Sequence, residues 1–159
     1  MRAKLTSIAV ALGLATLVPA APAVSESPNY REFRPAACTG TVVEGAQRGR
    51  FECVKVNVNA FNDGSTRIIF TAYQMREGRR EWFLLHAAIR AGDVAGATQS
   101  PAPIAFPITA FYIHRAIPEQ PPNTGPARWP LQGICTVSIA AIECGTNDAV
   151  GGFAMRAYF

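Results

Sequence analysis

From Cys38 onward, apolar side chains recur at every second position, and this period constrains the fold more than any other feature. The segment 51–60 shows it clearly, with Val54, Val56, Val58 and Ala60 on one face and Cys53, Lys55, Asn57 and Asn59 on the other. A period of two is typical of a β-strand with one buried and one solvated face, whereas a helix repeats every 3.6 residues. The pattern therefore predicts an all-β fold with antiparallel strands.

Turn signals divide this pattern into hairpins. Asp63-Gly64 is a strong signal, because this dipeptide readily takes the positive φ angles of tight turns. The expected strands cover 51–60, 66–74, 82–90, 104–117, 133–139, 141–145 and 152–159, with Pro107 at an edge or a bulge. No helical run longer than two turns is expected outside 84–90. Seven to eight short strands predict an antiparallel β-sandwich or a small β-barrel.

Four cysteines are expected to form two disulfides in an exported chain. Cys38 and Cys53 flank one expected hairpin, with its turn at 45–49, and Cys135 and Cys144 flank a shorter one. Facing residues of antiparallel strands lie within disulfide reach, so we predict the pairs Cys38–Cys53 and Cys135–Cys144. Neither pair has metal-site spacing, so no metal or cofactor is expected.

The N-terminus has the three parts of a secretory signal peptide. Arg2 and Lys4 precede an uncharged apolar run from Leu5 to Val18, which ends in small residues before a cleavage site near Ala23. No apolar stretch is long enough for a transmembrane helix. We therefore predict a signal over 1–23, a polar lead-in over 24–37 and one all-β domain over 38–159. The near absence of lysine beside 13 arginines indicates a bacterial source. Together with the export signal, it predicts a protein in the periplasm, in the outer envelope or outside the cell.

Catalytic motifs are absent from the sequence. His86 and His114 are possible general bases near neutral pH, but no nucleophile stands in a recognisable setting. His86 shares a strand face with Trp82 and Leu84, which indicates a partly buried histidine hydrogen-bonded within the sheet. His114 is expected at the surface, near a strand end. The sequence thus favours a protein that is not an enzyme.

A binding function fits the remaining features better. The segment 118–130 carries five prolines and is expected to be an irregular excursion whose stiffness limits the entropy lost on binding. Arg128 and Trp129 are residue types enriched in interface hot spots, and Arg79 and Arg80 lie in a neighbouring turn. We therefore predict a non-catalytic binding module, an enzyme inhibitor being one form of it, for a protein or a cell-envelope component.

Two other functions remain open, and nucleic acid is not an expected partner. Loss of Arg2 and Lys4 with the signal lowers the formal net charge from +4 to +2, too small an excess for nucleic-acid binding. The alternating C-terminal segment 152–159 ends on Phe159, which resembles the last strand of a small outer-membrane β-barrel. A secreted hydrolase that uses His86 or His114 is the third possibility.

Overall fold

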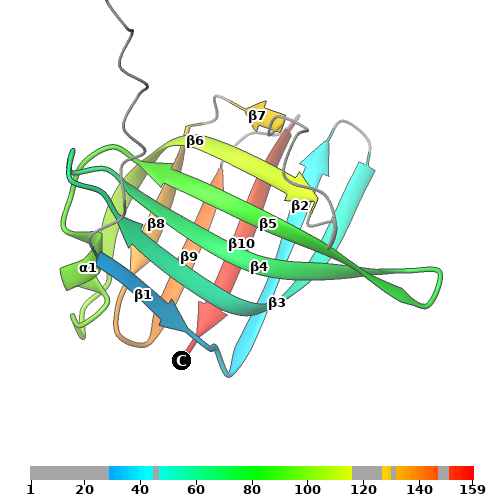
Figure 1. Cartoon of the computed structure of the whole chain (residues 1–159), viewed down its shortest axis with the longest axis horizontal. Coiled ribbons are helices and arrows are strands. Elements are labelled where there is room, and N and C mark those ends of the chain that lie inside the picture. Colours follow the sequence, from blue (N-terminus) through cyan, green and yellow to red (C-terminus); the bar gives the residue numbers. More distant parts are fainter. Residues whose placement is uncertain (1–28, 45–46, 116–126, 130–131, 147–150) are drawn as a thin grey trace, which may run out of the picture.

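The structure is a computed structural model, and it describes residues 29–44, 47–115, 127–129, 132–146 and 151–159. The elements are β1 (Asn29–Phe33), β2 (Ala37–Glu44), β3 (Gln47–Ala60), β4 (Thr66–Arg76), β5 (Arg79–Ile89), α1 (Val94–Ala97), β6 (Ile104–Arg115), β7 (Ala127–Trp129), β8 (Gly133–Val137), β9 (Ala141–Thr146) and β10 (Gly151–Tyr158). Strands dominate, so the all-β prediction is confirmed (Figure 1).

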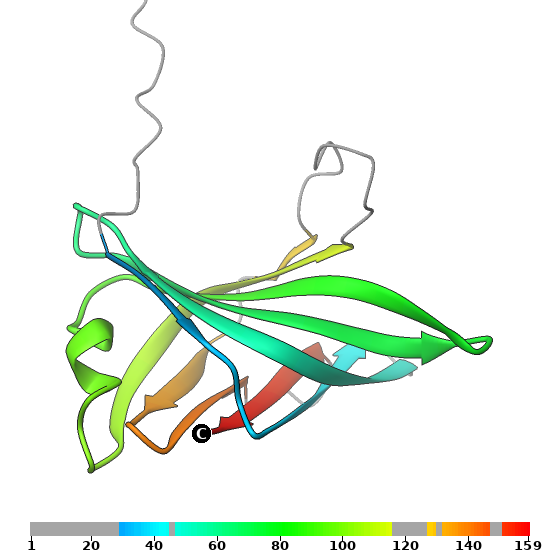
Figure 2. The same ribbon diagram turned by 60° about the horizontal axis from the view of Figure 1, so that its bottom comes forward.

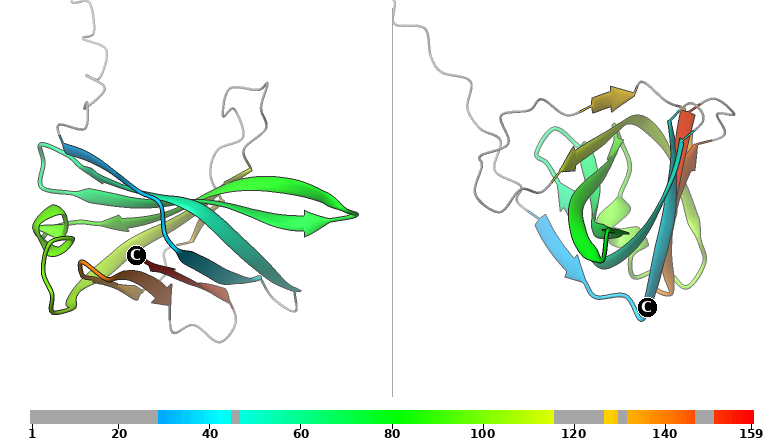
Figure 3. Two further views of the ribbon diagram at one scale, coloured as in Figure 1. Left: turned by 90° about the horizontal axis from the view of Figure 1, so that it is seen from below. Right: turned by 90° about the vertical axis from the view of Figure 1, so that its right-hand side faces the viewer.

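Eight strands close into an antiparallel barrel. Their order is β3-β2-β10-β9-β8-β6-β5-β4, and pairing of β4 with β3 closes the ring. Apart from β1 and β7, which lie outside the ring, consecutive strands along the chain are neighbours in the barrel, and the last strand, β10, pairs with the first, β2. This is the arrangement of an up-and-down barrel. The ring is visible in the right-hand view of Figure 3. Of the two predicted architectures, the structure therefore shows the small barrel.

The barrel interior is filled by apolar side chains from all eight strands. Phe111 of β6 and Phe153 of β10 stack across it with ring centroids 3.6 Å apart. Val54 departs from the predicted pattern, because its side chain is 46% exposed while Cys53 is buried. A β-bulge between Cys53 and Lys55 causes the departure. One extra residue reverses the alternation, so the prediction that Cys53 lies on the polar face is wrong.

Elements outside the eight-strand ring are a short helix and two strands. β1 lies in the predicted lead-in and pairs with the C-terminal half of β3, where Phe33 packs against the core. α1 lies in the predicted loop 91–103, near β3 and at one end of the barrel (Figure 2). Asp93 caps this helix by accepting a hydrogen bond from the Gly96 amide, 2.7 Å away. β7 pairs with β6 within the segment expected to be irregular. The segment 84–90 is strand, not helix.

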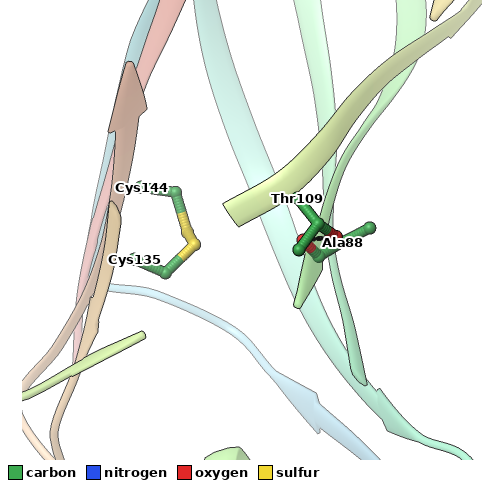
Figure 4. The surroundings of a disulfide bond; sticks show 4 residues. All are labelled: Ala88, Thr109, Cys135 and Cys144. Atoms are coloured by element: carbon green, nitrogen blue, oxygen red, sulfur yellow. Dashed lines mark hydrogen bonds between the residues drawn. A yellow bond between two sulfur atoms is a disulfide. The ribbon is translucent and has the colours of Figure 1, made fainter. Parts of the chain in front are cut away.

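Both predicted disulfides are present. Cys38–Cys53 joins β2 to β3, and Cys135–Cys144 joins β8 to β9. The second pair is directly cross-strand and its side chains point into the barrel (Figure 4). On the facing wall, Thr109 lies at a bulge between β5 and β6, and its hydroxyl donates to the Ala88 carbonyl. Disulfides persist in oxidising surroundings, which indicates a non-cytoplasmic compartment.

Candidate binding surface

The most prominent surface feature is the β4–β5 hairpin, which extends beyond the neighbouring strands (Figures 1 and 3). We call residues 74–81 the arm. At its tip Glu77 and Gly78 have φ angles of 52° and 77°, and two successive positive φ angles match a tight two-residue hairpin turn. The predicted turn at 76–80 is therefore shorter than expected, and Arg79 and Arg80 belong to strand β5.

The outward face of the arm begins on a group of aromatic rings. The Arg80 guanidinium lies 4.6 Å from the centroid of the Tyr73 ring, which is 5.2 Å from the Trp82 ring. The Tyr73 hydroxyl donates a hydrogen bond of 2.5 Å to the Glu52 carboxylate of β3. This hydrogen bond raises the pKa of Tyr73, because the ionised phenol has no proton to donate to Glu52. These contacts fix the base of the arm to the barrel wall.

The opposite face of the arm carries ion pairs. Glu81 accepts from Arg115 of β6 at 2.7 Å and lies 3.9 Å from Arg76. Arg79, at the start of β5, forms no ion pair within the described part of the chain. Its charge is therefore directed to solvent at the tip of the arm.

The same end of the barrel is rich in arginine. Register places the end of β2, the start of β3, the arm and the last residues of β6 at this end, because Glu44 faces Gln47 and Arg115 faces Phe83. The arginines there are Arg48, Arg50, Arg76, Arg79, Arg80 and Arg115, and the acidic residues are Glu44, Glu52, Glu77 and Glu81. This excess of positive charge would favour an acidic partner through long-range attraction.

The predicted residues Arg128 and Trp129 lie in β7. Their backbone pairs with Tyr112 and Phe111 of β6, whereas their side chains and the segments 118–126 and 130 lie outside the described residues. β6 leads into this segment from Arg115, whose Glu81 contact connects it to the arm. The last residue of β6, Arg115, and the arm thus lie at the same end of the barrel.

His86 and His114 lie together on the outer face of the β5–β6 wall. Their ring centroids are 4.8 Å apart, and His86 shares its face with Leu84 as predicted. Its Nε2 atom is buried and has no hydrogen-bond partner among the described residues, so this part of the predicted bonding is missing. His114 packs against His86 rather than lying free at the strand end. The residues described include no cluster of three or more His, Cys, Asp or Glu side chains that could hold a metal ion.

Several residues of this surface were missed by the sequence interpretation. Glu52 and Arg115 lie far from Arg79 and Arg80 in the sequence. Only the pairing of the strands brings these two residues, and Tyr73, to the same surface. The alternation of the sequence could have shown that Tyr73 and Trp82 share a face, provided that the turn is placed at residues 77–78. We predicted a turn of five residues, so this pairing was not recognised.

Fold and surface together define a class: a disulfide-bonded, eight-stranded antiparallel β-barrel with a filled interior and a projecting cationic hairpin. Comparison with known proteins goes no further, because no family profile, curated protein or solved structure matches the chain. Within the described residues, no helix is both long and apolar enough to cross a membrane.

Proposed function

We propose that this protein is an exported, non-catalytic binding module that holds an acidic partner, a protein or a cell-envelope component, on the arm. The observation that carries the proposal is Arg79. It projects at the tip of a hairpin that extends beyond the barrel, and no carboxylate in the described chain pairs with it. The next residue, Arg80, lies over the Tyr73 ring on the other face of the arm, so the arm presents one guanidinium group on each of its faces.

Export is supported by two features of different kinds. The chain starts with the charged, apolar and small-residue segments of a signal peptide. Two disulfides fit an oxidising compartment outside the cytoplasm.

The packing of the barrel favours binding on the outside over the other functions considered. Transmembrane β-barrels carry apolar residues outward and polar residues inward, whereas here Phe70 and Leu85 point inward and Arg67 points outward. A general base must reach its substrate, whereas the Nε2 atom of His86 is buried. The first observation supports a role in binding rather than membrane insertion, and the second argues against His86 as the base of a hydrolase.

The test is binding of the signal-cleaved protein to two defined acidic polymers, polyglutamate and polygalacturonate, measured by calorimetry at several salt concentrations. The double variant Arg79→Ala/Arg80→Ala should weaken binding of at least one polymer about tenfold and reduce the dependence of affinity on salt. The polymer that responds indicates whether the partner is peptide-like or polysaccharide-like.

A matched control is Arg34→Ala, because Arg34 is 85% exposed and lies near the start of β2, at the end of the barrel opposite the arm. Binding through the arm leaves this variant unchanged. Equal losses for both variants, or no loss for the double variant, would overturn the proposal, provided that the melting temperatures stay within a few degrees of one another.

A further inference from the structure

A hollow of about 460 Å³ lies on the outer face of β2, β3 and β10. Its lining residues are Thr39, Gly40, Thr41, Arg50, Ala154 and Arg156. None of these side chains is acidic, and two of them carry permanent positive charge. The hollow is therefore lined by cations and hydroxyls.

Strand register explains the shape of this hollow. Thr41 of β2 faces Arg50 of β3 on one side and Ala154 of β10 on the other, and Thr39 faces Arg156. The short side chains in the middle leave space between two long ones. Arg50 and Arg156 lie two strands apart and are offset by two residues along the strands. With about 4.8 Å between strands and about 3.4 Å per residue, their Cα atoms are about 12 Å apart, a gap that two arginine side chains can span above Thr39 and Thr41.

Two tyrosines hold the neighbouring carboxylates by hydrogen bonds, which leave the carboxylates charged but direct them away from ion pairs with these arginines. Glu143 of β9 faces Arg156, but its carboxylate accepts a hydrogen bond of 2.6 Å from the Tyr158 hydroxyl. Glu52 lies two residues after Arg50 on the same face, but it accepts from Tyr73. Neither arginine has an ion-pair partner in the described part of the chain.

A second hollow of about 290 Å³ adjoins the first and shares Ala154 and Arg156 with it. Thr136, Glu143 and Ile134 also line it, so this hollow includes one carboxylate, and Ile134 is 52% exposed. The two hollows together form a trough across β3, β2, β10, β9 and β8. The first part carries the two arginines, and the second part offers hydroxyl and apolar surface beside the Glu143 carboxylate. This lining suits a ligand with a negatively charged group over the first part and an uncharged body over the second.

We propose that this trough binds a small ligand through one oxyanion group, a carboxylate, sulfate or phosphate. Arg50 and Arg156 hold the oxyanion, because guanidinium groups match planar and tetrahedral oxyanions through paired N–H donors. Thr39 and Thr41 add hydroxyl donors, and the body of the ligand extends over Ala154 toward Ile134. This site goes beyond the binding role of the arm, because it takes a small molecule on another part of the surface.

The experiment is a titration of the isotope-labelled, signal-cleaved protein followed by NMR, with sulfate, phosphate, galacturonate and neutral galactose as probes. We expect saturable shifts confined to the amides of Thr39, Thr41, Ala154 and Arg156 for the anions and none for galactose. Galacturonate binding tighter than sulfate assigns a carboxylate-bearing sugar-like ligand, whereas the reverse assigns an inorganic or ester oxyanion. Shifts spread over all exposed arginines would overturn the proposal.

Variants separate the site from general charge attraction. Arg156→Gln should weaken the anion at least tenfold, whereas Arg67→Gln, which removes an exposed arginine from another wall of the barrel, should not. Tyr158→Phe gives a sharper test, because loss of the hydroxyl frees Glu143 to pair with Arg156 and should weaken binding several-fold. Glu143→Gln should strengthen it. An unchanged affinity in both of these variants would contradict the trough, while loss of binding only in Arg79→Ala would place the anion on the arm.

Discussion

His86 and His114 lie diagonally across β5 and β6, with ring centroids 4.8 Å apart and ring planes inclined at 52°. His86 faces Tyr112 in the register and His114 faces Leu84. Burial, and to a smaller extent the nearby charges of His114 and Arg67, together lower the pKa of His86 to about 4. The folded protein therefore keeps His86 neutral at pH values where a free imidazole would be protonated.

This arrangement predicts acid sensitivity within a defined pH range. Between pH 6.5 and about 4, the unfolded chain binds a proton at His86 and the folded chain does not. Protons then favour unfolding, so stability is greatest above pH 6.5 and falls as the pH is lowered toward 4. The loss should approach about 3 kcal/mol at the lower limit, measured as the free energy of unfolding in urea at half-unit pH steps.

The control for this effect is His86→Phe, which keeps a ring on the strand and removes the titration. This variant should show a flatter stability curve between pH 4 and 6.5. His114→Phe should show a smaller flattening, because it removes only one of the charges that act on His86. If His86→Phe keeps the full slope, carboxylates elsewhere cause the acid sensitivity.

The tip of the arm offers a stabilising substitution. Glu77 has a φ of 52° and is the only non-glycine residue with positive φ among those described. Asparagine tolerates this region better, and Asn-Gly is the preferred pair for such hairpin turns. Glu77→Asn should therefore raise the free energy of unfolding by several tenths of a kcal/mol, seen as a higher melting temperature. Glu77→Val, with a β-branched side chain at the same φ, should lower it.

Gly40 marks a point of close packing between β2 and β10. A Cβ atom there would overlap the Met155 sulfur and lie 2.7 Å from the Ala154 carbonyl oxygen. The methionine side chain can move, but the carbonyl belongs to a paired strand. Gly40→Ala should therefore destabilise the barrel by about 1–3 kcal/mol, measured by urea unfolding. Gly145→Ala is the control, because its nearest contact would be a milder 3.3 Å, and an equal loss there would contradict this explanation.

Most of the barrel could be predicted from local sequence because its strands alternate and its turns are short. Asp63-Gly64 forms the predicted turn, with Gly64 at a φ of 79° and the Asp63 carboxylate accepting from the Ser65 amide. β1 was missed because Asn29, Arg31 and Glu32 make three of its five residues polar, which leaves no apolar alternation to recognise. The bulge beside Val54 was missed because a bulge is defined by one extra residue relative to the partner strand, and the sequence of one strand does not show its partner.

The binding surface could be predicted only in part, because it depends on register. Arg79 and Arg80 could be predicted as surface residues, because the sequence itself shows their charge and their position beside a turn. The contact of Arg80 with Tyr73 joins β5 to β4, and the ion pair of Arg115 with Glu81 joins β6 to β5. Both contacts depend on how the strands pair, which the local sequence does not specify. The trough depends on β10 pairing with β2, which are 113 residues apart at Thr41 and Ala154 and meet only when the barrel closes.

The Cys135–Cys144 disulfide should stabilise the barrel without determining its fold. Five cross-strand pairs connect β8 and β9, so the backbone hydrogen bonds of this hairpin remain when both sulfurs are removed. The bond closes a loop of sequence separation 9, for which the entropy model gives a contribution of about 2–3 kcal/mol through the unfolded chain. Cys135→Ala/Cys144→Ala should lose that amount in urea unfolding and keep the amide NMR pattern of the other strands. Loss of the whole pattern would instead show that closure of the barrel requires this bond.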